Sequence, residues 1–159
     1  MPAAPHAIDA RLRELGLELP TAAAPAANYE PFSIARGLIF IAGQAPILDG
    51  KYLAVGRVGA EVSLADAVKA ARLCGLNVLA QAKAAVGGDW AKLKRCVRLC
   101  GYVSSAADFY DQPKVVDGAS DLMVEVLGPA GRHSRSAMGA YALRANVPVV
   151  VDAVFELAD

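Results

Sequence analysis

Apolar residues recur every three or four positions through the middle of the chain, and this pattern predicts one long amphipathic helix over residues 63–86. Ser63 is a suitable N-cap, and Asp66 follows it at the capping-box position. The pair Gly87-Gly88 ends the helix. Its single apolar stripe predicts that the helix lies on a sheet, and it consists of Leu64, Val68, Ala71, Gly75, Leu79, Ala82 and Val86.

Shorter apolar segments predict strands and a second helix around this element. Two strands joined at Arg36-Gly37 form a tight hairpin, because a two-residue joint with Gly favours that turn. Gly128-Pro129 stops the second helix. The predicted order is strands 29–35 and 38–44, helix 63–86, strand 93–104, helix 115–127, and strands 134–143 and 147–157. This order indicates an α+β domain with its helices on one face of a sheet.

The N-terminal part of the chain predicts a separate short helix. Apolar residues Ile8, Leu12, Leu15 and Leu17 alternate with charges, and Gly16 ends the pattern. Residues 20–27 then read as an extended linker. We therefore expect an N-terminal helix and linker over 1–27 and the main domain over 28–159.

The composition favours one small oligomeric domain. A chain of 159 residues can bury one full core. Hydrophobic residues make up 55% of it and the mean hydropathy is +0.36, so we expect the apolar excess in contacts between subunits. The formal net charge is zero, which argues against nucleic-acid binding because phosphate contacts require a basic surface.

Membrane and secretory segments are not expected. The longest apolar runs, 38–42 and 147–155, are far shorter than the ~20 residues that span a bilayer. The charged first 19 residues do not resemble a secretory signal, so a cytoplasmic protein is expected. Cys74, Cys96 and Cys100 are odd in number and lie in apolar segments, which favours reduced, buried thiols. Cys96 and Cys100 are expected to share one strand face, and no motif requires a metal or an organic cofactor.

The segment 131–137 places two guanidiniums and an imidazole at the start of an apolar strand. Arg135 enters this strand, where its planar fork can bind a carboxylate in bidentate fashion. The alternatives are a solvated loop or an ion pair with a nearby carboxylate such as Asp152. His133 is a candidate acid or base because imidazole exchanges its proton near neutral pH, although a turn histidine is often only a polar surface group.

Asp152 is a candidate because it lies within a strongly apolar strand, residues 149–154. A carboxylate in such a strand needs a partner or a function. The alternation of side chains along a strand could equally turn it outward.

Four sequence motifs carry a family resemblance, and they are Gly37–Pro46 (GLIFIAGQAP), Asn77–Ala80, Arg135-Ser136 and the strand containing Val151-Asp152-Ala153. Together they resemble the Rid family, also called the YjgF or L-PSP endoribonuclease family, over roughly residues 29–157. The resemblance implies a chorismate-mutase-like (bacillus type) α+β domain with a mixed sheet and two helices on one face. It also implies a homotrimer with a cleft between adjacent subunits.

The resemblance further implies an active site in that cleft. In the archetypal deaminases, the Arg matched by Arg135 holds the carboxylate of a 2-imino or 2-enamino acid, and water then releases ammonia to give a 2-oxo acid. Asp152 matches the acidic residue that orients the water, one methylene shorter than the usual Glu. Gly43 matches a glycine whose backbone lines the cleft.

Four cleft positions depart from the deaminase pattern. Phe32 stands where these enzymes have Tyr, Ala42 where they have Ser, and Ala137 where they have Cys; Asp117 falls near their Asn. These changes remove hydrogen-bonding groups but keep the anion anchor. The cleft is therefore expected to bind a small carboxylate with altered selectivity.

The resemblance leaves three functions open. The first is hydrolytic deamination, with Arg135 and Asp152 as catalytic residues. The second is a trimer that binds a small carboxylate metabolite without turnover. The third, an endoribonuclease or translation inhibitor, comes from the older family name and conflicts with the neutral charge.

Overall fold

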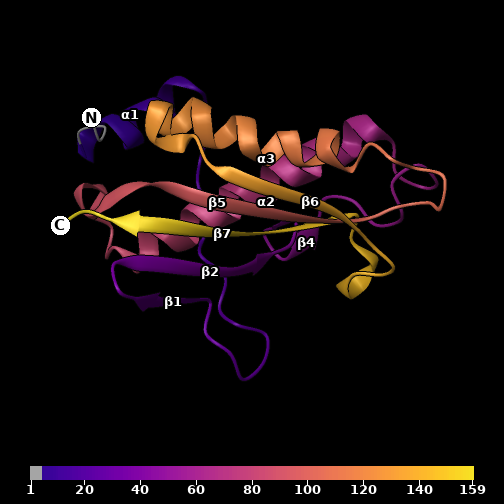
Figure 1. Ribbon diagram of the computed structural model, residues 1–159, viewed down its shortest axis with the longest axis horizontal. Helices are drawn as coiled ribbons and strands as arrows, with labels where there is room; N and C mark the ends of the chain where they lie inside the picture. The colour runs from indigo at the N-terminus through magenta and orange to yellow at the C-terminus, as the bar shows by residue number, and fades with distance from the viewer. Residues whose placement is uncertain (1–4) are drawn as a thin grey trace.

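A five-stranded mixed sheet forms the centre of the computed structural model, which describes residues 5–159 (Figure 1). Residues 1–4 of the predicted N-terminal segment 1–27 lie outside the described residues. The strand order is β1-β2-β7-β5-β6, and only the β5–β6 pair is parallel. The strands are β1 (Phe32–Ala35), β2 (Leu38–Gln44), β5 (Leu93–Ser104), β6 (Ser134–Ala140) and β7 (Val149–Leu157). This arrangement confirms the predicted mixed α+β fold.

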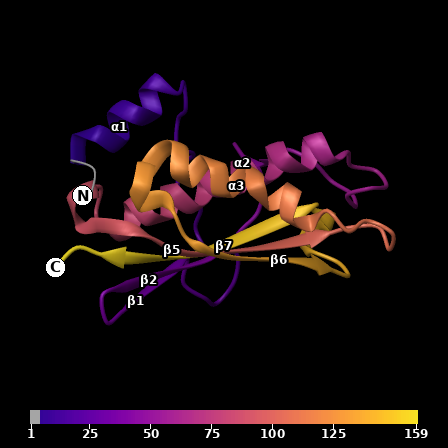
Figure 2. The same cartoon turned by 45° about the horizontal axis from the view of Figure 1, so that its top comes forward.

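Two long helices cover one face of the sheet (Figure 2). They are α2 (Leu64–Ala85) and α3 (Gln112–Leu127), and they pack against each other as well as on the strands. Because α3 lies over β5 and β6 while α2 lies over β2 and β7, each half of the sheet has its own helix. The opposite sheet face carries no helix within residues 5–159.

All seven predicted elements of the main domain are present, but the boundaries of four of them shift. The strand 93–104 is confirmed as β5. The first strand begins at Phe32 rather than at residue 29, directly after Pro31, which has no N–H for the ladder. Helix α3 begins at Gln112, three positions before its predicted start, because Pro113 is compatible with the first turn of a helix. The last two strands are shorter than predicted and are separated by a short 3-10 turn, η3 (Arg144–Asn146).

Both hairpins within residues 5–159 use left-handed turn residues. Arg36 and Gly37, with φ of 48° and 75°, confirm the predicted β1–β2 hairpin. A second hairpin, β3 (Ile47–Leu48) with β4 (Lys51–Tyr52), was not predicted. Its turn is Asp49-Gly50, with φ of 50° and 76°. The Asp-Gly pair was the signal for this turn, but strands of two residues are too short to show alternation.

Helix α2 confirms the predicted cap and exceeds the predicted burial. The Ser63 hydroxyl accepts a bond from the backbone N–H of Asp66 at 3.1 Å. The helix is buried well beyond one apolar stripe and includes the polar residues Asn77 and Gln81. Asn77 donates to the carbonyls of Ala45 and Ile47, and Gln81 donates to the carbonyl of Ala23. Through these bonds, the two amides attach the β3–β4 hairpin and the linker to α2.

The N-terminal helix α1 (Pro5–Glu14) packs on the domain through Ile8 and Leu12, which are both buried. The Asp9 carboxylate accepts bonds from Lys83 and from the indole of Trp90, both at 3.0 Å. Burial raises the pKa of Asp9, but these two bonds outweigh it and hold that pKa below its ordinary value. Trp90 is thus a buried packing residue that also orients α1.

All three cysteines are free and buried, as predicted. Burial raises the pKa of Cys74, and it raises that of Cys96 to about 12. The expectation that Cys96 and Cys100 share a strand face is wrong. A bulge between Cys96 and Arg98 shifts the register of β5, so Cys96 pairs with Phe155 and Cys100 pairs with Asp152, on opposite faces.

Candidate functional site

Arg135 lies where the edge strand β6 passes beneath helix α3. Its Nη1 donates to the Asp117 carboxylate at 2.6 Å and to the Ser120 hydroxyl at 3.2 Å. Asp117 and Ser120 are three positions apart on α3 and therefore lie on the same side of that helix. The Arg135 side chain is 25% exposed. The interpretation of Arg135 as partner of a carboxylate is confirmed, but the partner is Asp117 rather than Asp152.

One edge of the Arg135 guanidinium, formed by Nε and Nη2, takes no part in these bonds. Both bonds described above use Nη1, and neither Nε nor Nη2 has a hydrogen bond among residues 5–159. An Arg fork binds a carboxylate through two parallel N–H donors on one edge. The Asp117 ion pair therefore orients the side chain while its second edge can still bind an acid.

His133 forms part of the same cluster. Its Nε2 lies 3.0 Å from the Ser120 hydroxyl, and its Nδ1 lies 2.6 Å from the carbonyl oxygen of Gly131. The structure thus joins Asp117, Arg135, Ser120 and His133 into one hydrogen-bonded chain. Ser120 was not among the predicted site residues. The signal that could have identified it is its spacing from Asp117, which places both side chains beside the start of β6.

Asp152 lies on the other face of the sheet from Arg135. Arg135 pairs with Leu99 of β5, whereas Asp152 pairs with the next residue, Cys100. Successive side chains of a strand point to opposite faces, so Arg135 points toward the helices and Asp152 toward the open face. The structure does not bring the two predicted catalytic residues together within one chain.

A tyrosine holds the Asp152 carboxylate on the open face. Tyr102 donates its hydroxyl to Asp152 at 3.0 Å. Burial raises the pKa of Asp152, and the Tyr102 bond and the charge of Arg98 offset that effect only in part. The pKa of Tyr102 is also raised, by its contact with Cys100, by burial and by Asp152. Asp152 is thus a half-buried carboxylate that holds a proton more readily than usual.

We expect Asp152→Asn to raise the free energy of unfolding at pH 7, by less than about 1 kcal/mol because the group keeps part of its hydration. A raised native pKa means that wild-type stability is greatest below the unfolded pKa and falls as pH rises through the native pKa. The gain should therefore grow from acid toward neutral pH. Urea unfolding between pH 4.5 and 7 measures it.

Glu156→Gln on the same strand is the matched control for this measurement. Bonds from Lys94 and Arg95 lower the pKa of Glu156, so its replacement should reduce stability at neutral pH, and the reduction should shrink as pH falls. A variant Asp152→Asn less stable than the wild type at pH 7 would contradict the raised pKa.

The other predicted cleft residues lie at separate places. Phe32 and Ala42 are neighbours, because the Ala42 N–H donates to the carbonyl of Pro31. The Gly43 backbone passes so close to Val150 that a Cβ would lie 2.9 Å from its side chain. Gly43 also lines a hollow of about 200 Å³ beside Arg144. Ala137 packs on the core from β6, on the helix side of the sheet.

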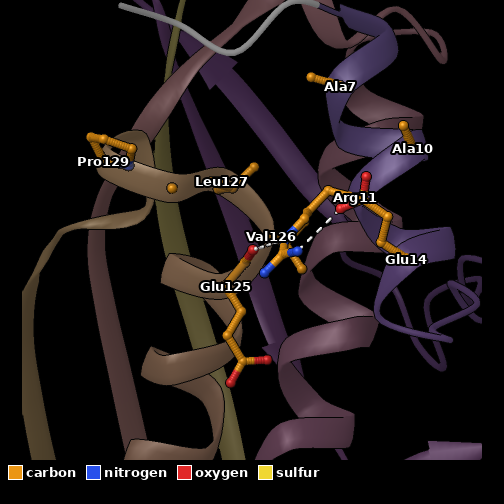
Figure 3. A pocket seen from close by; sticks show the side chains of 9 residues that line it. Ala7, Ala10, Arg11, Glu14, Glu125, Val126, Leu127 and Pro129 are labelled. Carbon is orange, nitrogen blue, oxygen red and sulfur yellow. Dashed lines mark hydrogen bonds and ion pairs between the residues drawn. The ribbon is translucent and has the colours of Figure 1, made fainter.

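A larger hollow, about 450 Å³, lies between α1 and the C-terminal end of α3 (Figure 3). Arg11 crosses it, with Nε donating to the carbonyl of Glu125 and Nη1 pairing with Glu14. None of the predicted site residues lines this hollow. The hollow lies where α1 docks on the domain, and it is separate from the Arg135 cluster.

Two other kinds of feature, a membrane-spanning helix and a metal site, are absent from residues 5–159. No helix in this part of the chain combines the length and the apolar character that a membrane span needs. No group of three or more His, Cys, Asp or Glu side chains within the same residues is placed to hold a metal ion.

Comparison with known proteins gives the family. Residues 9–157 match the model of the family described as YjgF/chorismate mutase-like, putative endoribonuclease. This match begins inside α1 and is longer than the resemblance over 29–157. Protein TCP17 of Trypanosoma cruzi is 40% identical over 151 residues, which are 94% of each chain.

Two solved structures are similar over almost their whole length. Protein Atu1372 of unknown function from Agrobacterium tumefaciens is 44% identical, with a TM-score of 0.90 over 97% of this chain and 95% of that one. A putative endoribonuclease from Shewanella oneidensis is 39% identical, with a TM-score of 0.91 over 94% of this chain and 99% of that one. The chain therefore belongs to the YjgF/chorismate mutase-like family of putative endoribonucleases.

Proposed function

We propose that the protein is a hydrolytic deaminase of small 2-imino acids and their 2-enamino tautomers, with Arg135 as the anchor of the substrate carboxylate. The observation that carries this proposal is the Arg135 guanidinium, oriented by Asp117 and Ser120 through Nη1 and with its other edge unbonded within the described residues. Such an edge is complementary to a planar carboxylate.

The proposed site requires two copies of the chain. Arg135 faces the helices and Asp152 faces the open side of the sheet, so a substrate held by one cannot reach the other within a single chain. A second copy docked at the β6 edge can supply Asp152 from its own open face. Phe40 and Met138 are exposed on that face, at 42% and 45%, and support a contact between subunits there. We infer a homotrimer with one such cleft between each pair of neighbours.

Each group has one role in the proposed reaction. Arg135 fixes the carboxylate and places the imine carbon, and Asp152 of the neighbouring copy orients a water molecule toward that carbon. Water adds to C2, and the C–N bond of the adduct then breaks to give ammonia and a 2-oxo acid. The hydroxyls missing at Phe32 and Ala42 would make the walls less polar, which favours apolar side chains on the substrate.

The experiment generates 2-aminoacrylate or a branched-chain 2-imino acid enzymatically and traps the remaining imine with semicarbazide, with and without the protein. We expect less trapped imine and faster ammonia release with the protein present. Saturable binding of a 2-oxo acid without faster ammonia release would instead favour the metabolite-binding alternative. RNA cleavage by the highly purified protein would favour the endoribonuclease alternative.

The oligomeric state of the same protein samples should be measured by sedimentation. A trimer in solution supports the shared cleft, whereas an active monomer would contradict it.

Three free thiols are also what a reducing compartment such as the cytoplasm favours, and we place the protein there.

A further inference from the structure

Ser120 and His133 form a hydrogen-bonded pair directly beside the proposed carboxylate anchor. The Gly131 carbonyl can only accept, so the 2.6 Å contact places a hydrogen on Nδ1 of His133. The atom that gains or loses a proton is therefore Nε2, which lies 3.0 Å from the Ser120 hydroxyl. The backbone carbonyl thus fixes the tautomer of the imidazole, as a carboxylate does in other serine–histidine pairs.

The direction of the bonds at Ser120 depends on the charge of His133. Arg135 can only donate, so Ser120 accepts its bond at 3.2 Å. With a neutral imidazole, the Ser120 hydroxyl donates to Nε2. With a protonated imidazole, Nε2 donates instead, and the Ser120 hydrogen is released toward a molecule held by Arg135.

We propose that Ser120 is the general acid of this site and that His133 supplies its proton. This role rests on the proposed function. When the C–N bond of the water adduct breaks, the electron pair stays on nitrogen, which takes the Ser120 hydroxyl proton. Ser120 takes the proton from Nε2 of His133, and the adduct hydroxyl loses its proton to solvent as the carbonyl forms. Solvent then returns a proton to Nε2 of His133. The products are ammonia and the 2-oxo acid.

The surrounding charges are compatible with this exchange. Arg135 on β6 and Asp117 on α3 form an ion pair with each other, so their opposite charges lie together beside Ser120. Arg132 directly precedes His133 in the chain and is exposed. On β5, Arg98 lies on the opposite sheet face, where it bonds Ser136. Ser120 is a positioning group for Arg135 in any case, so the test must separate positioning from proton transfer.

The experiment measures kcat and KM for ammonia release between pH 5.5 and 9 in wild type, Ser120→Ala, Ser120→Thr and His133→Gln. We expect Ser120→Ala to lower kcat about 100-fold or more with KM within about threefold. Ser120→Thr keeps a hydroxyl and should recover most of the rate. His133→Gln removes the group that supplies the proton to Ser120, so it should also lower kcat with little change in KM.

Ser134→Ala is the matched control, because Ser134 is an exposed serine on β6 that bonds only the Val97 carbonyl. It should behave as the wild type does. Wild-type kcat in Ser120→Ala, or a raised KM alone, overturns the acid role, as does wild-type kcat in His133→Gln. These outcomes leave the deaminase function standing, whereas a wild-type protein without ammonia release overturns both.

Discussion

Replacing Arg135 with Ala is expected to lower kcat/KM for ammonia release by about 1,000-fold or more. The substitution removes the two donors that would hold the carboxylate, and misplacement of the substrate then affects the chemical step as well as binding. A loss of this size corresponds to roughly 4 kcal/mol of transition-state stabilisation. Arg135→Lys should recover only a small part, because an ammonium keeps the charge but not the planar fork.

The folded state should tolerate this change. Arg135 pairs with Asp117, whose side chain is 49% exposed, and such exposed pairs contribute at most about 1 kcal/mol. Arg132→Ala, at an exposed position three residues earlier, is the control and should keep wild-type activity. Activity is measured with the semicarbazide trap and stability with urea. Wild-type kcat/KM in folded Arg135→Ala would eliminate Arg135 as the anchor.

Replacing Gly118 with Ala is expected to lower the free energy of unfolding by about 3 kcal/mol or more, or to prevent folding. Gly118 lies where α3 crosses α2, and a Cβ there would overlap the backbone carbonyl oxygen of Val68. Backbone cannot move aside as a side-chain end does, so the two helices must separate. The better helix propensity of Ala returns only about 1 kcal/mol, so the overlap dominates.

Gly139→Ala is the control for this prediction. Gly139 lies on β6, where the Cβ of an alanine would lie 3.5 Å from its nearest neighbour, Nε2 of Gln112, which is an ordinary contact. We expect a change within about 0.5 kcal/mol, as for surface substitutions generally. Urea unfolding followed by circular dichroism compares the variants. Equal stabilities of Gly118→Ala and Gly139→Ala would show that α2 and α3 are not packed as closely as described.

Local pattern was sufficient for the long elements of the fold. The stripe of α2, its Ser63 cap and the twelve residues of β5 depend on neighbours along the chain, and these were predicted correctly. The β3–β4 hairpin was missed because its strands have two residues each and are held by Asn77 from a distant helix. The pattern of neighbouring residues cannot show a contact with a side chain 30 positions away in the chain.

The candidate site shows the same division. The amino-acid sequence alone identified the chemical groups of the site. These are an Arg at the start of β6, a histidine two positions before it and an acid in an apolar strand. Which of these groups come into contact depends on the three-dimensional fold, because strand register and helix docking join residues far apart in the chain. Register places Arg135 and Asp152 on opposite faces of the sheet, and the docking of α3 brings Ser120 to Arg135 and His133.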